Sequence, residues 1–305
     1  MSESQHNNKT LSEDWKLNLR ESFITAITTT DSAKKQQATE DVGYYYKCCA
    51  PAFLYKYYSG SIEKLETVIN NSMWYSAPSC FNDVFDCDYS IDEDSIFQGF
   101  LSLYADKKIL PGSQVWRELR KVTNKEIKSF RTTLSQIRDT TGVSCLSEAD
   151  DSILMWAHYA HNHQGMCVEY DLARINSSLQ FTPVPIIYSG EKTCLRSIDI
   201  DNTGEEMTRF LIHMLTTKSK DWHYEKEWRI IREDSACGSS WDNEKHGALL
   251  EMIPPSSIIL GCEASIDLEN LVREYCSTNR ISLYRMGKDT QSYRLNKNGS
   301  IQNSV

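Results

Sequence analysis

The chain has 305 residues, which is long enough for one large domain or two modest ones. A hydrophobic share of 40% and a charged share of 25% are typical of a folded protein and exclude the disordered and low-complexity classes. Asp and Glu outnumber Lys and Arg by 42 to 33, and the net charge of −9 excludes a general nucleic-acid coat while leaving a local basic patch open.

No segment of the sequence predicts export or membrane insertion. The longest apolar run is far shorter than the roughly 20 residues that span a bilayer, and the N-terminal segment is polar. The ten cysteines are scattered without a C-x-x-C spacing, which predicts reduced thiols. We therefore expect a cytoplasmic protein with no membrane partner.

Residues 1–50 are predicted to form an appendage that precedes the main domain. Apolar residues recur at near-helical spacing over residues 10–29, which predicts a helix. Residues 28–43 are small or charged and end at Gly43, which predicts a linker or mobile loop. The apolar stripe of the helix leaves open a homo-oligomer or a partner complex formed through it.

Residues 51–305 are predicted to form a single α+β domain. Short strands are interrupted irregularly by helices, which favours mixed or antiparallel sheets with flanking helices over a doubly wound sheet. Strands are expected at residues 52–59, 73–77, 142–147, 166–171, 181–188, 225–233, 247–253, 256–261 and 281–286, and helices at 61–71, 93–105, 113–138, 152–163, 204–219 and 265–277.

The first chemical signal is the segment Trp-His-Tyr-Glu-Lys-Glu-Trp-Arg-Ile-Ile at residues 222–231. Side chains alternate along a strand, so Glu225, Glu227 and Arg229 are expected on one face. Two carboxylates about 7 Å apart repel each other unless a positive group lies between them. Such a pair can hold a sugar hydroxyl or a developing cation, and the alternative is a solvated face with Glu–Arg ion pairs.

The second signal is an aromatic strand, helix and second strand that open the main domain. Aromatic rings there could stack on a ligand, a lysine could face a phosphate and a serine could orient the ligand by a hydrogen bond. Packing of these aromatic residues in the core is the alternative. The candidates are Tyr55, Lys56, Tyr57, Trp74, Tyr75 and Ser76.

Two further groups raise the question of a metal site. Asp83, Asp86 and Asp88 could bind a hard cation, but they lack the spacing of an EF-hand loop, and Asx turns use the same residues. His158 and His161 are three residues apart, yet no third zinc ligand is evident. We predict no metal site and expect His158 to line a binding site.

Five sequence blocks, in order, resemble a bacterial family catalogued only as a domain of unknown function, number twenty-nine seventy-one. The blocks are LYKYYS, MWYSAPSCFNDVFD, SCLSEADDSILMWAHYAHNHQGMCVEYD, WHYEKEWRII and SSIILG. The layout of elements is in turn similar to the ADP-ribosyltransferase fold, although the FNDVFD and WAHYAHNH blocks have no role in that pattern.

The second resemblance implies an enzyme that acts on NAD, either an ADP-ribosyltransferase or an NAD glycohydrolase. Glu227 then corresponds to the catalytic carboxylate and Glu225 to the acceptor-side carboxylate. Ser76 corresponds to the residue beside nicotinamide, and Tyr55 or Lys56 occupies the place of an NAD-anchoring His or Arg. The acceptor would be a protein or a nucleic acid, and a toxin or phage-defence role fits. The expected NAD-binding set is Tyr55, Lys56, Tyr57, Trp74, Tyr75, Ser76, Asn82, Asp83 and His158.

Two other function classes stay open. A metal-dependent nuclease or phosphoesterase would use Asp83, Asp86, His158 and a glutamate. A non-catalytic interaction module would use the helix at residues 10–29. A serine hydrolase has little support, because no G-x-S-x-G motif is present.

Overall fold

The structure is a computed structural model that describes residues 14–178, 182–200, 204–233 and 237–299. The chain divides into two compact units, Met1–Ala50 and Pro51–Val305. None of the helices in the described ranges has the length and apolar character that crossing a membrane requires.

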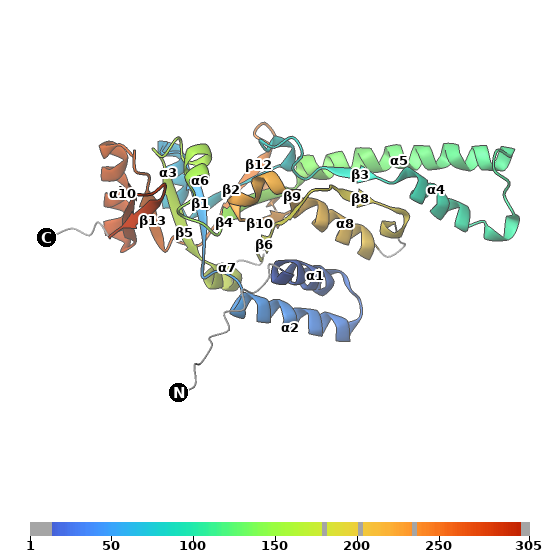
Figure 1. The fold of residues 1–305 in the computed structure, drawn as a ribbon, viewed down its shortest axis with the longest axis horizontal. Coiled ribbons are helices and arrows are strands. Elements are labelled where there is room, and N and C mark those ends of the chain that lie inside the picture. Colours follow the sequence, from blue (N-terminus) through green and yellow to red (C-terminus); the bar gives the residue numbers. More distant parts are fainter. Residues whose placement is uncertain (1–13, 179–181, 201–203, 234–236, 300–305) are drawn as a thin grey trace. The chain divides into compact units, whose positions relative to one another are not determined.

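The first unit contains two helices that pack against each other (Figure 1). Helix α1 spans Asp14–Thr28 and α2 spans Ser32–Cys48, so the linker predicted at residues 28–43 is wrong. The stretch is rich in Ala, Lys, Gln and Glu, which are good helix formers, and Asp31 caps it by accepting the N–H groups of Ala33 and Lys34 at 2.9 and 3.1 Å. Residues 10–13 of the predicted first helix lie outside the described residues. Its role in oligomer or partner binding stays a prediction.

The second unit is built on a mixed sheet, which confirms the predicted α+β class with short strands. The strand order is β11-β12-β2-β4-β1-β5-β13-β14-β15, with β10 paired to β4 and to β6. All of these pairs are antiparallel except β13 with β14. The strands are β1 (Phe53–Tyr58), β2 (Ser72–Ser76), β4 (Gly142–Ser147), β5 (Met166–Asp171), β6 (Val184–Pro185), β10 (Glu227–Arg232), β11 (Trp241–Asp242), β12 (Gly247–Glu251), β13 (Ser257–Leu260), β14 (Ser282–Lys288) and β15 (Leu295–Asn298).

Helices and two small parallel strand pairs complete this unit. The pairs are β3 (Tyr89–Ile91) with β8 (Thr193–Leu195), and β7 (Ile187–Ser189) with β9 (Thr217–Ser219). The helices are α3 (Ile62–Ile69), α4 (Glu93–Ser102), α5 (Gln114–Thr140), α6 (Ile153–Tyr159), α7 (Leu172–Ser178), α8 (Glu205–Leu215) and α10 (Ile266–Asn279), and the 3-10 turns that bear on the site are η1 (Pro78–Cys80) and η4 (Lys220–Glu225).

The strand predicted at 181–188 is two short strands, β6 and β7, and residue 181 lies outside the described residues. Three other predicted elements have bounds that differ from those expected in ways that affect the site. The helix predicted at 204–219 ends at Leu215, and β9 follows it. The helix predicted at 152–163 ends at Tyr159. The strand predicted at 225–233 begins only at Glu227, after the 3-10 turn η4. Side chains near these boundaries therefore point in directions that the strand and helix periods did not predict.

Strand β4 is the branch point of the sheet. Strand β10 pairs with β4 along its whole length, from Gly142 to Ser147. On its other edge β4 meets β1 at Ser147 and β2 at Val143, with a single residue pair in each case. Because β1 and β2 join β4 at opposite ends, residues of these two strands are held apart.

The turn after α6 is fixed by a close approach between backbones. His161, Asn162 and His163 all have positive φ, between 49° and 66°, and the N–H of Gly165 donates to the carbonyl of Ala160 at 2.8 Å. A Cβ atom at Gly165 would lie 2.1 Å from the carbonyl oxygen of Tyr58. Only glycine lets this turn pack against β1, which in turn positions α6.

We predict that Gly165→Ala destabilises the protein by about 3 kcal/mol, because the added methyl group overpacks a backbone contact. Urea denaturation followed by circular dichroism measures this change. Gly190→Ala is the matched control, since a Cβ atom there meets nothing within 4 Å. Equal denaturation midpoints for the two variants would contradict the requirement for glycine at this turn.

Candidate functional site

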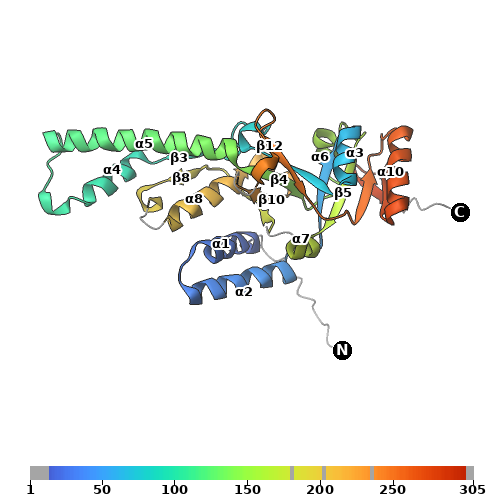
Figure 2. The same cartoon turned by 180° about the vertical axis from the view of Figure 1, so that it is seen from behind.

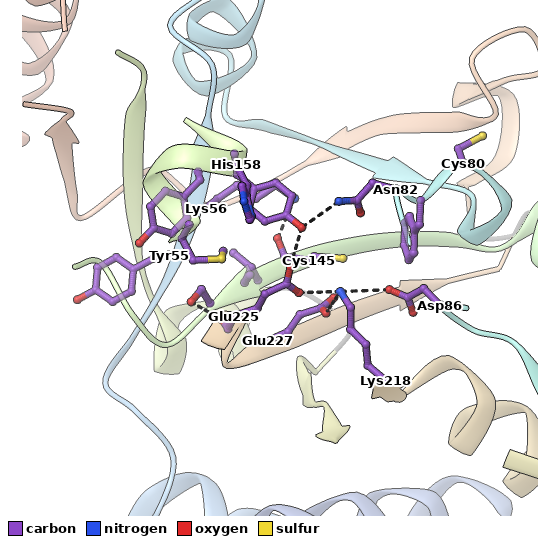
Figure 3. A pocket seen from close by; sticks show the side chains of 16 residues that line it. Tyr55, Lys56, Cys80, Asn82, Asp86, Cys145, His158, Lys218, Glu225 and Glu227 are labelled. Carbon is purple, nitrogen blue, oxygen red and sulfur yellow. Dashed lines mark hydrogen bonds and ion pairs between the residues drawn. The ribbon is translucent and has the colours of Figure 1, made fainter. Parts of the chain in front are cut away.

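A cavity of about 430 Å³ opens beside β1 and β4 in the second unit (Figure 3). Its walls come from residues 55–57 of β1, residues 80–82 after β2, residues 145–147 of β4 and the α6 helix. Lys218, Glu225 and Glu227 line it as well. Segments that are far apart in the sequence therefore build one site.

Five buried charged side chains form a network along one side of this cavity. Lys218 Nζ lies 2.6 Å from Glu225 Oε2, 3.0 Å from Glu227 Oε2 and 3.2 Å from Asp86 Oδ2 (Figure 3). Arg229 Nη2 contacts both carboxylate oxygens of Asp86 at 2.7 and 2.8 Å, and Arg229 Nε donates to Glu227 Oε1 at 2.7 Å. Three carboxylates share two cations, so the network carries one excess negative charge when all its members are ionised.

Lys218 is the positive group that the two glutamates required. Its role is not apparent from the sequence, because residues 204–219 are predicted to form one helix and a lysine near a helix end is ordinary. The structure places Lys218 in β9, where only 5% of its side chain is exposed. The one available signal was the electrostatic argument that two neighbouring carboxylates need a cation between them.

Glu225 reaches this network from a turn and not from the strand. It is the last residue of η4, and Lys226 follows with a left-handed φ of 44°. The prediction that Glu225, Glu227 and Arg229 share one strand face is therefore wrong for Glu225, although Glu227 and Arg229 do share a face of β10. The main-chain carbonyl of Glu225 accepts the Ser147 hydroxyl at 2.6 Å, which fixes the turn against β4.

The two glutamates differ in protonation behaviour. Burial raises the pKa of Glu225 above its ordinary value of 4.5, and the charge of Lys218 offsets this only in part. Burial also acts to raise the pKa of Glu227, but the charges of Arg229 and Lys218 outweigh it and bring that pKa well below 4.5. Glu227 is thus a permanent anion, and Glu225 is the carboxyl group that can exchange a proton.

A chain of hydrogen bonds connects Glu225 to two blocks that the transferase layout left without a role. The Tyr159 hydroxyl donates to Glu225 Oε1 at 2.6 Å, and the Asn82 side-chain amide donates to the Tyr159 oxygen at 3.3 Å. Beside them, His158 Nδ1 lies 3.0 Å from the Tyr224 hydroxyl. The FNDVFD and WAHYAHNH blocks therefore meet at the cavity, and they orient the titratable glutamate.

The first strand contributes aromatic surface to the cavity. Tyr55 donates its hydroxyl to Glu169 at 3.2 Å and Tyr57 donates to the Ala149 carbonyl at 2.7 Å, so these hydroxyls are engaged by other residues. Lys56 Nζ donates to the Cys145 carbonyl at 2.8 Å. The lysine expected to face a phosphate is instead held against β4.

Trp74, Tyr75 and Ser76 do not line the cavity, which corrects the expectation that β1 and β2 enclose one cleft. Tyr75 is fully buried in the core. The reason is the branching at β4, where β2 joins at Val143 and β1 at Ser147. The residue expected beside nicotinamide is thus at the other end of β4.

Asp83 also does not line the cavity, in contrast to the expectation that it binds a ligand. Its Oδ1 accepts the N–H of Phe85 at 2.9 Å, which is an Asx turn. Among the described residues, no group of three or more His, Cys, Asp or Glu is arranged to hold a metal ion. The carboxylate of Asp86 is instead paired with the two cations of the network, Lys218 and Arg229. These ion pairs do not favour the nuclease alternative.

The fold and the site thus define a mixed α+β protein with a buried ionic network beside an aromatic cavity. Residues 155–230 match the model of a family described as "Protein of unknown function (DUF2971)". The matched part contains Tyr159, Lys218, Glu225 and Glu227, so the family resemblance is supported over the segment that supplies most of the network. No curated protein and no solved structure matches the chain.

Glu225 and Glu227 are expected to change the stability of the protein with pH in opposite directions. The folded pKa of Glu225 is raised, so the stability it contributes at low pH is lost as pH rises above 4.5. Glutamine does not ionise, so the Glu225→Gln variant does not lose this stability. The difference in free energy of unfolding, variant minus wild type, should therefore increase from pH 4.5 to 8. The folded pKa of Glu227 is lowered, so its contribution is complete above pH 4.5 and is lost as pH falls below that value.

Glu227→Gln should therefore be less stable than wild type at pH 7, by about 3 kcal/mol because it breaks a buried ion pair, with a deficit that shrinks below pH 4.5. Urea denaturation from pH 3 to 8 measures both variants. Glu66→Gln, at an exposed position of α3, is the control. Parallel slopes for the two buried variants would contradict the assigned protonation states.

Proposed function

We propose that the cavity binds NAD and cleaves the bond between nicotinamide and ribose, as an ADP-ribosyltransferase or an NAD glycohydrolase. One observation carries this proposal. Glu225 lies in an aromatic-walled cavity with a raised pKa, a hydrogen bond from Tyr159 and an ion pair to Lys218. Buried carboxyl groups with shifted pKa values are concentrated at catalytic sites.

The size and lining of the cavity suit the nicotinamide riboside half of the dinucleotide. A volume of about 430 Å³ lies within the range of ordinary ligand pockets. Tyr55, Tyr57, Phe81 and Tyr159 supply aromatic surface for a planar ring. A ring bound against these walls would displace water, which would strengthen electrostatic interactions inside the site.

The chemistry requires a carboxylate next to the ribose. As the C–N bond breaks, its electron pair leaves with nicotinamide and positive charge develops on the sugar. The ionised Glu225 would accept a hydrogen bond from the ribose 2′-hydroxyl and stabilise that charge, a contribution of about 3 kcal/mol in a preorganised site. Water or an acceptor group then attacks the anomeric carbon and releases a proton, and Glu225 is placed to receive it.

This proposal exchanges the roles that the sequence resemblance implied for the two glutamates. Glu227 is bound by both Arg229 and Lys218 and does not titrate near neutral pH. We assign to Glu227 the role of positioning Lys218. Lys218 in turn positions Glu225. Ser76 takes no part in the reaction.

The biological setting follows from the chemistry. An enzyme that depletes NAD or modifies a macromolecule harms the cell in which it acts, so a bacterial toxin or phage-defence effector remains our expectation. NAD is a cytoplasmic metabolite, which is the reason to expect the protein in the cytoplasm.

We predict that the purified protein releases nicotinamide from NAD and that Glu225→Gln slows the release at least about 100-fold. Chromatography of the reaction mixture, with and without bacterial extract as a source of acceptor, measures the rate. Glu66→Gln is the matched control and should keep the wild-type rate. The proposal fails if wild type leaves NAD intact under both conditions, or if Glu225→Gln is as fast as wild type.

Tyr159→Phe tests the hydrogen bond to Glu225. That bond lowers the pKa of Glu225, so its loss should raise the pKa further. If the ionised carboxylate is the active form, the rising limb of the kcat/KM profile should move to higher pH, while the rate at alkaline pH changes by less than about tenfold. An unshifted profile would contradict the role of Tyr159 as a positioning residue.

A further inference from the structure

A basic helix stands out from this acidic protein. Helices α4 and α5 pack side by side and extend away from the central sheet in both views (Figure 1 and Figure 2). The 27 residues of α5 are about 40 Å long at 1.5 Å per residue. They contain seven Lys and Arg against three Asp and Glu, a net charge of +4 in a chain of net charge −9. The rest of the chain is therefore strongly acidic, at −13.

The positive charge is concentrated on the outer face of α5. Arg117, Lys121, Lys125 and Lys128 follow one another at intervals of four, four and three residues, which places them on one side of a helix. We call these four residues the basic stripe. All four are exposed, and together they cover about 17 Å of helix axis.

Most of the stripe is not neutralised by the protein itself. Lys121 pairs with Glu118 at 2.9 Å. Among the residues that the structure describes, no acidic side chain forms an ion pair with Arg117, Lys125 or Lys128. Three neighbouring cations without counter-charges repel each other, so the stripe favours an external anion with repeated charges.

Two other arginines of α5 have a structural role. Arg120 pairs with Asp94 at 2.9 Å and Arg131 pairs with Glu93 at 3.1 Å, and both pairs connect α5 to α4. They hold the helix in place and leave the stripe facing solvent.

The buried face of α5 distinguishes between a nucleic acid and a membrane as the polyanion. A helix that lies on a membrane inserts its apolar face between the lipids. In α5 that face is already used, because Thr123, Ile127 and Leu134 are buried within the protein. A surface that offers regularly spaced cations and keeps its main apolar face covered fits the phosphates of a nucleic acid.

The C-terminal end of α5 also contacts a segment that lines the candidate active site. At the C-terminal end of α5, Arg138 Nη2 donates to the main-chain carbonyl of Asp86 at 3.3 Å. The side chain of Asp86 lines the cavity and belongs to its ionic network (Figure 3). The helix that carries the stripe therefore contacts, at its C-terminal end, the segment that lines the cavity.

We propose that the basic stripe of α5 binds the phosphate backbone of a nucleic acid, which serves as the acceptor at the cavity. The second half of this statement rests on the proposed NAD-cleaving function. Binding of a nucleic acid to the stripe does not depend on that function. Contacts to the phosphate backbone have low sequence specificity.

The test compares two variants that carry the same change in net charge. The stripe variant replaces Arg117, Lys121, Lys125 and Lys128 by Gln. The control variant also replaces three lysines and one arginine by Gln, at exposed positions outside α5. These residues are Lys34, Lys35, Lys245 and Arg280. Fluorescence anisotropy measures binding of the full-length protein to a labelled 20-nucleotide single strand and to a 20-base-pair duplex, between 50 and 300 mM salt.

We expect wild type and the control variant to bind at least one of the two probes with equal affinity. The stripe variant should bind at least about tenfold more weakly at 100 mM salt, and the slope of log K against log salt should decrease by about 3, because four phosphate contacts are lost. Equal binding by both variants, or no binding by wild type at 50 mM salt, would overturn the inference. Binding only to vesicles that contain 30% phosphatidylserine would also overturn it, in favour of a membrane.

Nicotinamide release by the stripe variant, measured without an acceptor, separates this inference from the proposed function. The variant should match wild type there, because the stripe lies outside the cavity. If neither protein consumes NAD, with or without bacterial extract, but the stripe still determines nucleic-acid binding, the docking surface stands and the proposed function fails. If NAD is consumed and the two variants bind nucleic acid equally, the proposed function stands and the docking surface fails.

Discussion

The buried contact between Lys218, Arg229 and three carboxylates is the interaction on which the site depends. Asp86 comes from the loop before β3, Glu225 from the turn η4 and Glu227 from β10, and each would be an uncompensated charge in the interior without these cations. Removing one partner of such a network costs about 3–5 kcal/mol, which is a large part of the stability of a domain. The network therefore holds together the segment before β3, the strand β9, the turn η4 and the strand β10, and the cavity exists where they meet.

The same network makes two chemically identical side chains different. Arg229 binds Glu227 and Asp86, while the Glu225 side chain is bound, within the described part of the chain, by Lys218 and the Tyr159 hydroxyl. The carboxyl group with two cationic partners stays ionised, and the one with fewer becomes titratable. Pairs of carboxyl groups whose surroundings separate their pKa values are a recurrent basis for dividing catalytic roles. Burial removes water from the carboxyl group of Glu225. This disfavours its ionised form and raises its pKa.

Charge is also distributed unevenly over the second unit. The acidic composition describes the chain as a whole, yet three cations on the outer face of α5, Arg117, Lys125 and Lys128, form no ion pair with a residue that the structure describes. Helix α5 can do this because its apolar side packs into the unit and two arginines anchor it to α4. Its last turn contacts the segment that carries Asp86, a residue that lines the cavity.

The sequence by itself determined the α+β class, the central strands such as β4 and β5, and the two glutamates with their need for a cation. These features are local, since alternation, capping residues and the spacing of charges act over a few neighbouring residues. The tertiary structure alone identified Lys218 as that cation, joined Asn82 to Tyr159, and separated Ser76 from Tyr55 at the two ends of β4. Contacts of the ionic network connect residues up to 143 positions apart, as between Arg229 and Asp86. A periodic pattern shows which face a side chain occupies, but the partner it meets there depends on how distant segments pack.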